Sequence, residues 1–285
     1  MAGLLALAIA TPQAMLGSHD PHRSQPMSGV APSRDGIPLA FEVHGAGTPA
    51  LVFVHGWSCD RSYWRRQLGP LAAQYQTVAV DLAGHGESGV GRRAWTMAAF
   101  GEDVVAVVEQ LGLGELVLVG HSMGGDVIVE AALRLGGQVA GLVWVDTYST
   151  LGEPPTDDEI EAFLAPFRED FVTATRALVG RLFTPDADAE LVEWVASDMS
   201  AAPPEIAVDA LGHAVGNERG ILAGLRQLRA PVVAINPDAR PTDAEALRRH
   251  GVRAVLMSGV GHFLMLEDPD RFNRQLGEVI ETFRG

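Results

Sequence analysis

A serine flanked by glycines directly follows an apolar run in this sequence. Leu116–Val119 predicts a buried strand, and Gly120, Ser122 and Gly124 form a G-x-S-x-G pattern at its end. Apolar residues then recur at helical spacing from Asp126 to Leu135. The serine is therefore expected on a tight turn between a strand and a helix, where its hydroxyl is exposed and can act as a nucleophile once a base removes its proton.

His262 is the candidate base. It lies in a loop rich in glycine that directly follows the predicted strand Ala254–Met257, and it comes late in the chain. A serine, a carboxylate and a histidine can form a triad that carries out acyl transfer, in which the imidazole accepts the serine proton and the carboxylate orients the imidazole.

Four segments at predicted strand ends resemble the α/β-hydrolase superfamily between Ile37 and Arg284. They are Phe53-Val54-His55-Gly56-Trp57, Asp81-Leu82-Ala83-Gly84-His85-Gly86-Glu87-Ser88-Gly89, the serine turn, and Gly259-Val260-Gly261-His262-Phe263. The resemblance implies a serine hydrolase whose oxyanion hole is formed by the backbone N–H groups of Trp57 and Met123. The second segment is taken as a family marker with a structural role.

The acid of the triad is left open between two residues. The commonest family pattern places it in the loop after the strand Val232–Ile235, but that position falls on Arg240 in this sequence. Asp146, directly after the strand Gly141–Val145, matches the placement in part of the haloalkane-dehalogenase branch and is the preferred candidate. Asp238 is the alternative.

The order of elements predicts an α/β fold: an α/β-hydrolase fold with a mostly parallel central sheet flanked by helices. The alternation of strands and helices breaks after the sixth strand, where residues 147–220 show only helical spacing and several prolines. We expect this segment to form a helical lid, with residues 31–146 and 221–285 as the core and residues 1–30 as an N-terminal extension or weak signal-like segment.

Composition limits the partners. The 285-residue chain has a net charge of −15, which argues against nucleic acid as a partner because phosphate binding needs basic patches. No stretch is apolar for long enough to predict a membrane span. We expect a small-molecule acyl substrate, no cofactor and no metal, because no metal-ligating motif is present. The oligomeric state is left open.

The N-terminal segment bears on the compartment. Gly3 to Ala10 is apolar, but no basic residue precedes it, so Met27 is an alternative start to Met1. A cytoplasmic protein is expected, and a secreted or periplasmic one is the alternative if this segment is a signal peptide.

The predicted function is hydrolysis of a small carboxylic ester or related acyl compound through an acyl-enzyme on Ser122. A cofactor-free perhydrolase, a lactonase or a carbon–carbon bond hydrolase would use the same triad and remains an alternative. A ligand-binding, receptor-like module with little turnover is the alternative of another class.

Overall fold

Eight strands form one sheet in the computed structural model, which describes residues 26–284. The order across the sheet is β1-β2-β4-β3-β5-β6-β7-β8. The first two strands run antiparallel to their neighbours, and all the other pairs are parallel. The strands are β1 (Met27–Pro32), β2 (Pro38–His44), β3 (Ala50–Val54), β4 (Gln76–Val80), β5 (Leu116–His121), β6 (Val139–Val145), β7 (Val232–Pro237) and β8 (Val252–Met257). The predicted mostly parallel sheet is confirmed.

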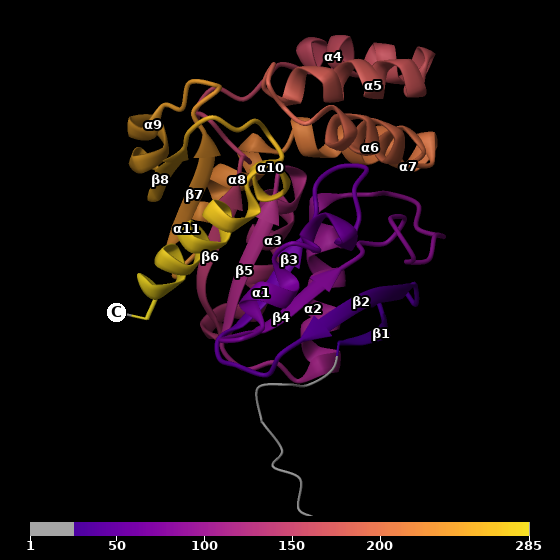
Figure 1. The fold of residues 1–285 in the computed structure, drawn as a ribbon. Helices are drawn as coiled ribbons and strands as arrows, with labels where there is room; N and C mark the ends of the chain where they lie inside the picture. Colours follow the sequence, from indigo (N-terminus) through magenta and orange to yellow (C-terminus); the bar gives the residue numbers. More distant parts are fainter. Residues whose placement is uncertain (1–25, 285) are drawn as a thin grey trace, which may run out of the picture.

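Helices cover the sheet, which is why its central strands are continuous apolar runs. Every residue of β3, β5 and β7 is buried, as expected for parallel strands packed on both faces. In Figure 1, α11 crosses in front of the strands. The helices are α1 (Leu68–Leu71), α2 (Met97–Leu111), α3 (Met123–Leu135), α4 (Asp157–Glu169), α5 (Phe171–Leu182), α6 (Ala189–Ser200), α7 (Pro204–Val215), α8 (Glu218–Leu225), α9 (Ala244–Arg249), α10 (Leu264–Glu267) and α11 (Pro269–Glu281), with the short 3-10 helices η1 (Arg61–Trp64) and η2 (Gly136–Gln138).

Strand β1 differs from the sequence-based expectation. Residues 27–30 were expected in an N-terminal extension, but they pair with β2 at the edge of the sheet. The signal for a strand is weak there because β1 has neighbours on one side only, contains glycine and proline, and leaves Met27 and Val30 exposed. The signal-like stretch Gly3 to Ala10 lies outside the described residues.

The chain between β6 and β7 is entirely helical where it is regular. Figure 1 shows α4, α5, α6 and α7 above the carboxyl ends of the parallel strands. Helix α4 starts at a capping box, in which Thr156 and Glu159 satisfy each other's backbone N–H groups. Helix α8, which crosses the expected boundary at residue 220, packs on α3. The part that lies over the sheet is therefore α4–α7.

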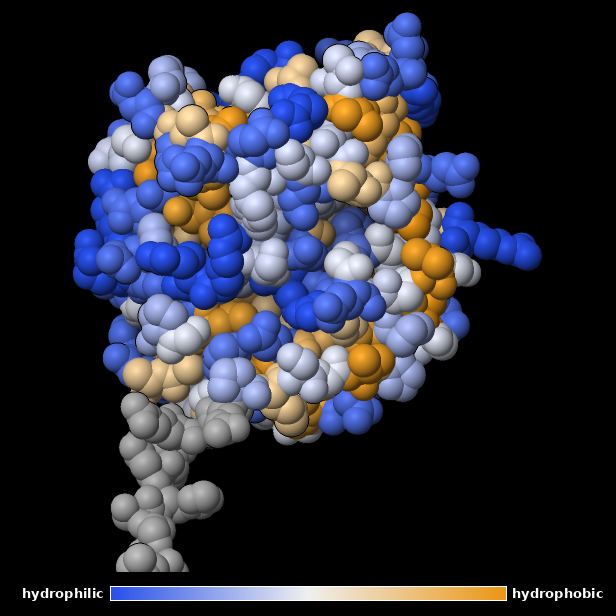
Figure 2. All heavy atoms as spheres, turned by 45° about the vertical axis from the view of Figure 1, so that its right-hand side comes forward, coloured by the Kyte–Doolittle hydropathy of each residue, from blue (hydrophilic) through white to orange (hydrophobic). Residues whose placement is uncertain are grey.

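The face of the molecule in Figure 2 is mainly hydrophilic. On the face in Figure 2, hydrophobic side chains form separate patches between hydrophilic ones. Within residues 26–284, no helix has the length and apolar character needed to cross a bilayer.

A buried carboxylate connects both ends of the inserted helices to α3. Asp126 Oδ2 accepts hydrogen bonds from Tyr148, just after β6, at 3.3 Å and from Asn217, just before α8, at 3.0 Å. Burial raises the pKa of Asp126 to about 7, although the hydrogen bonds from Asn217 and Tyr148 act in the opposite direction. Asp126 is therefore protonated in the folded protein at a pH where it is ionised in the unfolded chain.

Asp126→Asn is expected to remove a pH dependence of stability. Because the folded state binds the extra proton, the free energy of unfolding should fall as the pH rises from about 4 to about 7. Asn does not ionise, so the melting temperature of the variant relative to the parent should rise by roughly 4–8 °C between about pH 5 and pH 8, equivalent to about 2 kcal/mol. Thermal unfolding at several pH values measures this. Glu109→Gln, which removes an exposed carboxylate from α2, is the control, and an equal pH dependence in parent and Asp126→Asn would contradict the prediction.

Candidate active site

Ser122 lies at the turn between β5 and α3, as expected. Its backbone has φ 51° and ψ −120°, a conformation that costs a non-glycine residue about 1–3 kcal/mol. The turn is held by hydrogen bonds from Ser122 N to Val145 O and from Gly125 N to Ser122 O, both 2.9 Å long. These hydrogen bonds hold the strained conformation in place and leave the serine partly exposed.

The glycines beside Ser122 are required by close backbone contacts. A β-carbon on Gly120 would lie 2.2 Å from Gly124 O. A β-carbon on Gly124 would lie 2.5 Å from Val54 O and 2.6 Å from His55 O. The strand end, the start of the helix and the loop after β3 can therefore approach each other only without these side-chain atoms.

His262 and Asp146 form a buried hydrogen-bonded pair. His262 Nδ1 lies 2.6 Å from Asp146 Oδ2. Burial raises the pKa of Asp146, but the hydrogen bond from His262 and the charges of His262 and Arg240 outweigh it, so that this pKa lies below its usual value. The carboxylate is therefore ionised and can orient the imidazole.

The backbone fixes both members of the pair. Asp146 directly follows β6 with φ 47°, and its N–H donates to Ile235 O at 3.0 Å. The N–H of His262 donates to Leu182 O, at the end of α5, at 2.8 Å.

Asp238 has a different partner. Its Oδ1 accepts a hydrogen bond from the backbone N–H of Gly259 at 3.0 Å. Asp238 therefore supports the start of the loop that carries His262, while the imidazole itself contacts Asp146. Of the two candidate acids, the structure brings Asp146 to the histidine and not Asp238.

Ser122, His262 and Asp146 line one cavity of about 220 Å³. Among the described residues, no hydrogen bond joins Ser122 Oγ to His262, a contact that often tightens only when substrate is bound. Trp57 lines the same cavity, and Met123 is the first residue of α3. Neither the Trp57 nor the Met123 N–H donates to another group of the described chain.

The inserted helices supply part of the apolar wall of this cavity, and Trp57, Cys59 and Phe263 supply the rest. Each of the four contributes at least one side chain, namely Phe163 from α4, Leu178 and Leu182 from α5, Met199 from α6 and Leu211 from α7. Trp57 also joins the insertion to the core, since its indole N–H donates to Ala207 O at 2.7 Å and its ring meets Phe167 edge-on at 5.4 Å.

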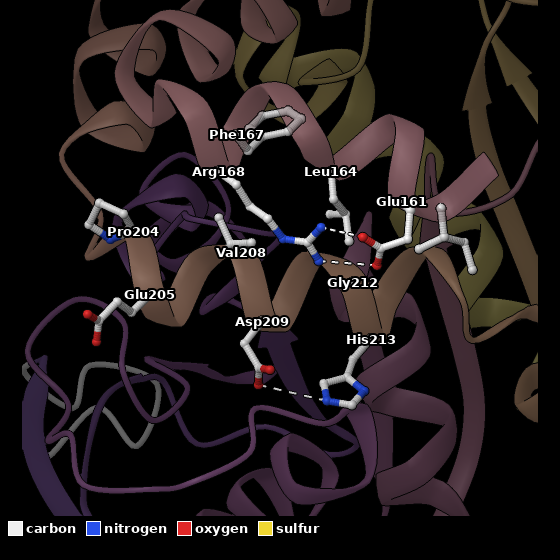
Figure 3. Close-up of a pocket in the computed structure, with 11 residues that line it drawn as sticks. Glu161, Leu164, Phe167, Arg168, Pro204, Glu205, Val208, Asp209, Gly212 and His213 are labelled. Carbon is white, nitrogen blue, oxygen red and sulfur yellow. Dashed lines mark hydrogen bonds and ion pairs between the residues drawn. The ribbon is translucent and has the colours of Figure 1, made fainter. Parts of the chain in front are cut away.

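A larger cavity of about 610 Å³ lies elsewhere, between α4 and α7 (Figure 3). Four of its ionisable side chains form pairs along a helix, Arg168 with Glu161 and His213 with Asp209. Because neither Ser122, His262 nor Asp146 lines it, we place the candidate site in the smaller cavity.

The sequence analysis did not find two residues of the site. Arg240, noted only as unable to serve as the acid, forms an ion pair with Asp146. His121, between Gly120 and Ser122, lies with its Nε2 3.0 Å from His262 O, and burial lowers its pKa well below the usual value. His121 is therefore neutral and donates from Nε2 to this carbonyl. The signal that could have found them was their position: His121 is next to the nucleophile, and Arg240 stands where the commonest family pattern has the acid.

The Asp81 loop has the structural role that was expected. Asp81 accepts hydrogen bonds from the backbone N–H groups of Arg61 at 2.7 Å and Glu87 at 2.8 Å. A β-carbon on Gly86 would lie 2.4 Å from Asp81 Oδ2. This loop, residues 81–89, contributes no residue to the lining of the cavity that holds Ser122.

Comparison with known proteins identifies relatives over most of the chain. The chain is 29% identical over 245 residues to the dihydrolipoyllysine-residue acetyltransferase component of the acetoin cleaving system of Pseudomonas putida, covering 83% of this chain but only 64% of that protein. It is 24% identical to 3-oxoadipate enol-lactonase 2 of Acinetobacter baylyi, covering 87% of this chain and 94% of that protein.

Solved structures of the same fold include esterases. A thermophilic esterase from Thermogutta terrifontis superposes with a TM-score of 0.75 at 27% identity, covering 92% of this chain and all of that one (100%). A bromoperoxidase from Bacillus anthracis, at 21% identity, has a TM-score of 0.77 over 90% of this chain and 100% of that chain, which shows the shared fold.

The family model described as "Alpha/beta hydrolase family" matches residues 51–275. This range includes residues 53–57, the Asp81 loop, the serine turn and the His262 loop, which are the segments that carried the resemblance in the sequence. The expected resemblance is therefore confirmed, and the chain belongs to the Alpha/beta hydrolase family, a family of hydrolytic enzymes.

Proposed function

We propose that this chain is a serine hydrolase that cleaves a small carboxylic ester or related acyl compound through an acyl-enzyme on Ser122. The observation that carries the proposal is the 2.6 Å contact between His262 Nδ1 and Asp146 Oδ2 in the cavity where Ser122 is held at φ 51°. A strained, partly exposed serine beside an oriented imidazole is the arrangement that acyl transfer needs.

The chemistry follows from the donors and acceptors. An ionised carboxylate only accepts, so the proton between Asp146 and His262 belongs to Nδ1, and Nε2 is left as the base. Ser122 Oγ forms a bond to the substrate carbonyl carbon as its proton moves to Nε2. The tetrahedral oxyanion would be stabilised by the N–H groups of Trp57 and Met123, and collapse expels the alcohol with the Nε2 proton. Water then releases the acid by the same steps.

The cavity supports a small, largely apolar acyl group. Its volume of about 220 Å³ is below the range of roughly 300–1,000 Å³ common for drug-sized ligands. Five of the fourteen residues that line it lie on α4–α7, so we propose that these helices, within the inserted residues 147–220, act as a lid over the core that contains the sheet. Relatives named as an enol-lactonase and a bromoperoxidase keep lactones and perhydrolysis as alternatives.

The direct test is labelling with a fluorophosphonate, which forms a stable adduct on an activated serine. Intact mass measurement should find one adduct on the parent and none on Ser122→Ala. Ser197→Ala, a change at an exposed serine of α6 that does not line the cavity, is the control and should label as the parent does. A substrate panel of short esters, lactones, and acids with hydrogen peroxide then separates the hydrolytic alternatives.

Each outcome has a clear meaning. An adduct lost only in Ser122→Ala supports the serine hydrolase and places its nucleophile. A folded parent that takes up no adduct would contradict the proposal and favour the receptor-like module.

A further inference from the structure

Arg240 touches the carboxylate that orients His262. It lies in the loop between β7 and α9, with half of its side chain exposed, whereas the side chain of Asp146 is 3% exposed. Its Nη2 contacts Asp146 Oδ2, the same oxygen that lies 2.6 Å from His262 Nδ1. One carboxylate oxygen therefore accepts from both a guanidinium and an imidazole.

The contact between Arg240 and the imidazole differs from a hydrogen bond. Arg240 Nη2 lies 3.4 Å from His262 Nδ1, but the guanidinium has no acceptor, and Nδ1 carries the proton that points to Asp146. Two donors therefore face each other beside a shared acceptor. The positive charge of Arg240 opposes a second positive charge on the imidazole.

We propose that Arg240 is a positioning residue of the candidate triad. It holds the Asp146 carboxylate and keeps the His262 imidazole neutral down to a lower pH, so that the imidazole can accept the Ser122 proton. This inference rests on the proposed function of the site. It also gives a role to the position where the commonest family pattern has the acid: this chain has a cation there and the acid after β6.

The other charged and titratable groups around His262 do not supply this charge. His121, at the end of β5, has its ring centroid 4.5 Å from that of His262, but burial lowers its pKa well below the usual value, so it is neutral. Glu267, on α10, accepts hydrogen bonds from Gly261 N at 3.0 and 2.9 Å. Asp146 and Glu267 are acidic, and Arg240 is the only arginine side chain of the described chain that lines this cavity.

The test compares Arg240→Gln with Arg240→Lys. In Arg240→Gln, the acidic limb of the kcat/KM profile for a short ester should move up by about 0.5–1 pH unit, because the like charge beside the imidazole is gone and half exposure screens its effect. Activity near pH 6 should then fall about 3–10-fold, with a change of less than about threefold on the plateau. Arg240→Lys should keep the parent profile because it keeps the charge.

Arg168→Gln is the matched control. Arg168 is also about half exposed, at 48%, and also pairs with a carboxylate, but it lies on α4 in the outer cavity. Its profile should match that of the parent. Superposable profiles for Arg240→Gln and the parent, or equal shifts in Arg240→Gln and Arg240→Lys, would overturn the proposal.

A readout without turnover separates this inference from the proposed function. The titration of the His262 ring can be followed by NMR in the parent and in Arg240→Gln, with His262→Gln used to assign the signal. A shift of the titration in Arg240→Gln supports the inference even in a chain that hydrolyses no ester. Unchanged titration in a protein that labels at Ser122 rejects the role of Arg240 and leaves the serine hydrolase standing.

Discussion

Asp146→Asn is expected to lower kcat for a short ester by about 10³–10⁴-fold, whereas Asp238→Asn should change it by less than about threefold. Asp146 Oδ2 lies 2.6 Å from His262 Nδ1, while Asp238 accepts a hydrogen bond from the backbone of Gly259. An asparagine at position 146 keeps the shape but loses the charge, and its amide can hold the imidazole with the proton on the wrong nitrogen. Asparagine at position 238 can still accept from Gly259.

Each variant serves as the control for the other, because each removes one carboxylate from a loop at the carboxyl ends of the parallel strands. Steady-state kinetics should be accompanied by thermal unfolding, which verifies that both variants are folded. A large loss in Asp238→Asn with near-normal activity in Asp146→Asn would reverse the assignment of the acid. Comparable losses in both would indicate that the His262 loop, supported by Asp238, is as important as the charge of Asp146.

This assignment depends on tertiary structure, which is why the sequence left it open. The serine turn could be predicted because its requirements are local: a buried strand, two glycines and a helix follow one another in the chain. The His262 loop was found in the same way. Which carboxylate reaches the imidazole depends on how the loops after β6 and β7 lie side by side. Asp238 and Asp146 both follow a strand, and no local pattern separates them.

Arg240 and the inserted helices show the same limit. The sequence indicated only that Arg240 cannot act as the acid, but the structure shows it in contact with the acid that follows another strand. The helical nature of the insertion could be predicted from spacing and prolines. Which faces of α4–α7 line the 220 Å³ cavity, and which border the larger outer one, depends on packing between helices that sequence periodicity does not specify.

Ser122→Ala and His262→Ala are each expected to lower kcat by at least about 10⁴-fold, and the double variant should be no slower than the slower single variant within about threefold. The reason is that the two side chains act in one step: the imidazole is useful only when a serine proton is available, and the serine attacks only when a base accepts that proton. Residual hydrolysis in all three variants would come from substrate binding and from the N–H groups of Trp57 and Met123, which none of these changes removes.

The cycle is measured with one activated short ester, with each variant purified separately from the parent so that traces of active protein do not set the floor. His250→Ala, in the turn after α9 and away from the cavity, is the control for loss of a histidine and should retain the parent rate. Losses that multiply in the double variant would mean that Ser122 and His262 act independently, which contradicts a shared acyl-transfer step. Equal losses, together with a fluorophosphonate adduct that requires both residues, would tie the two side chains to the same proton.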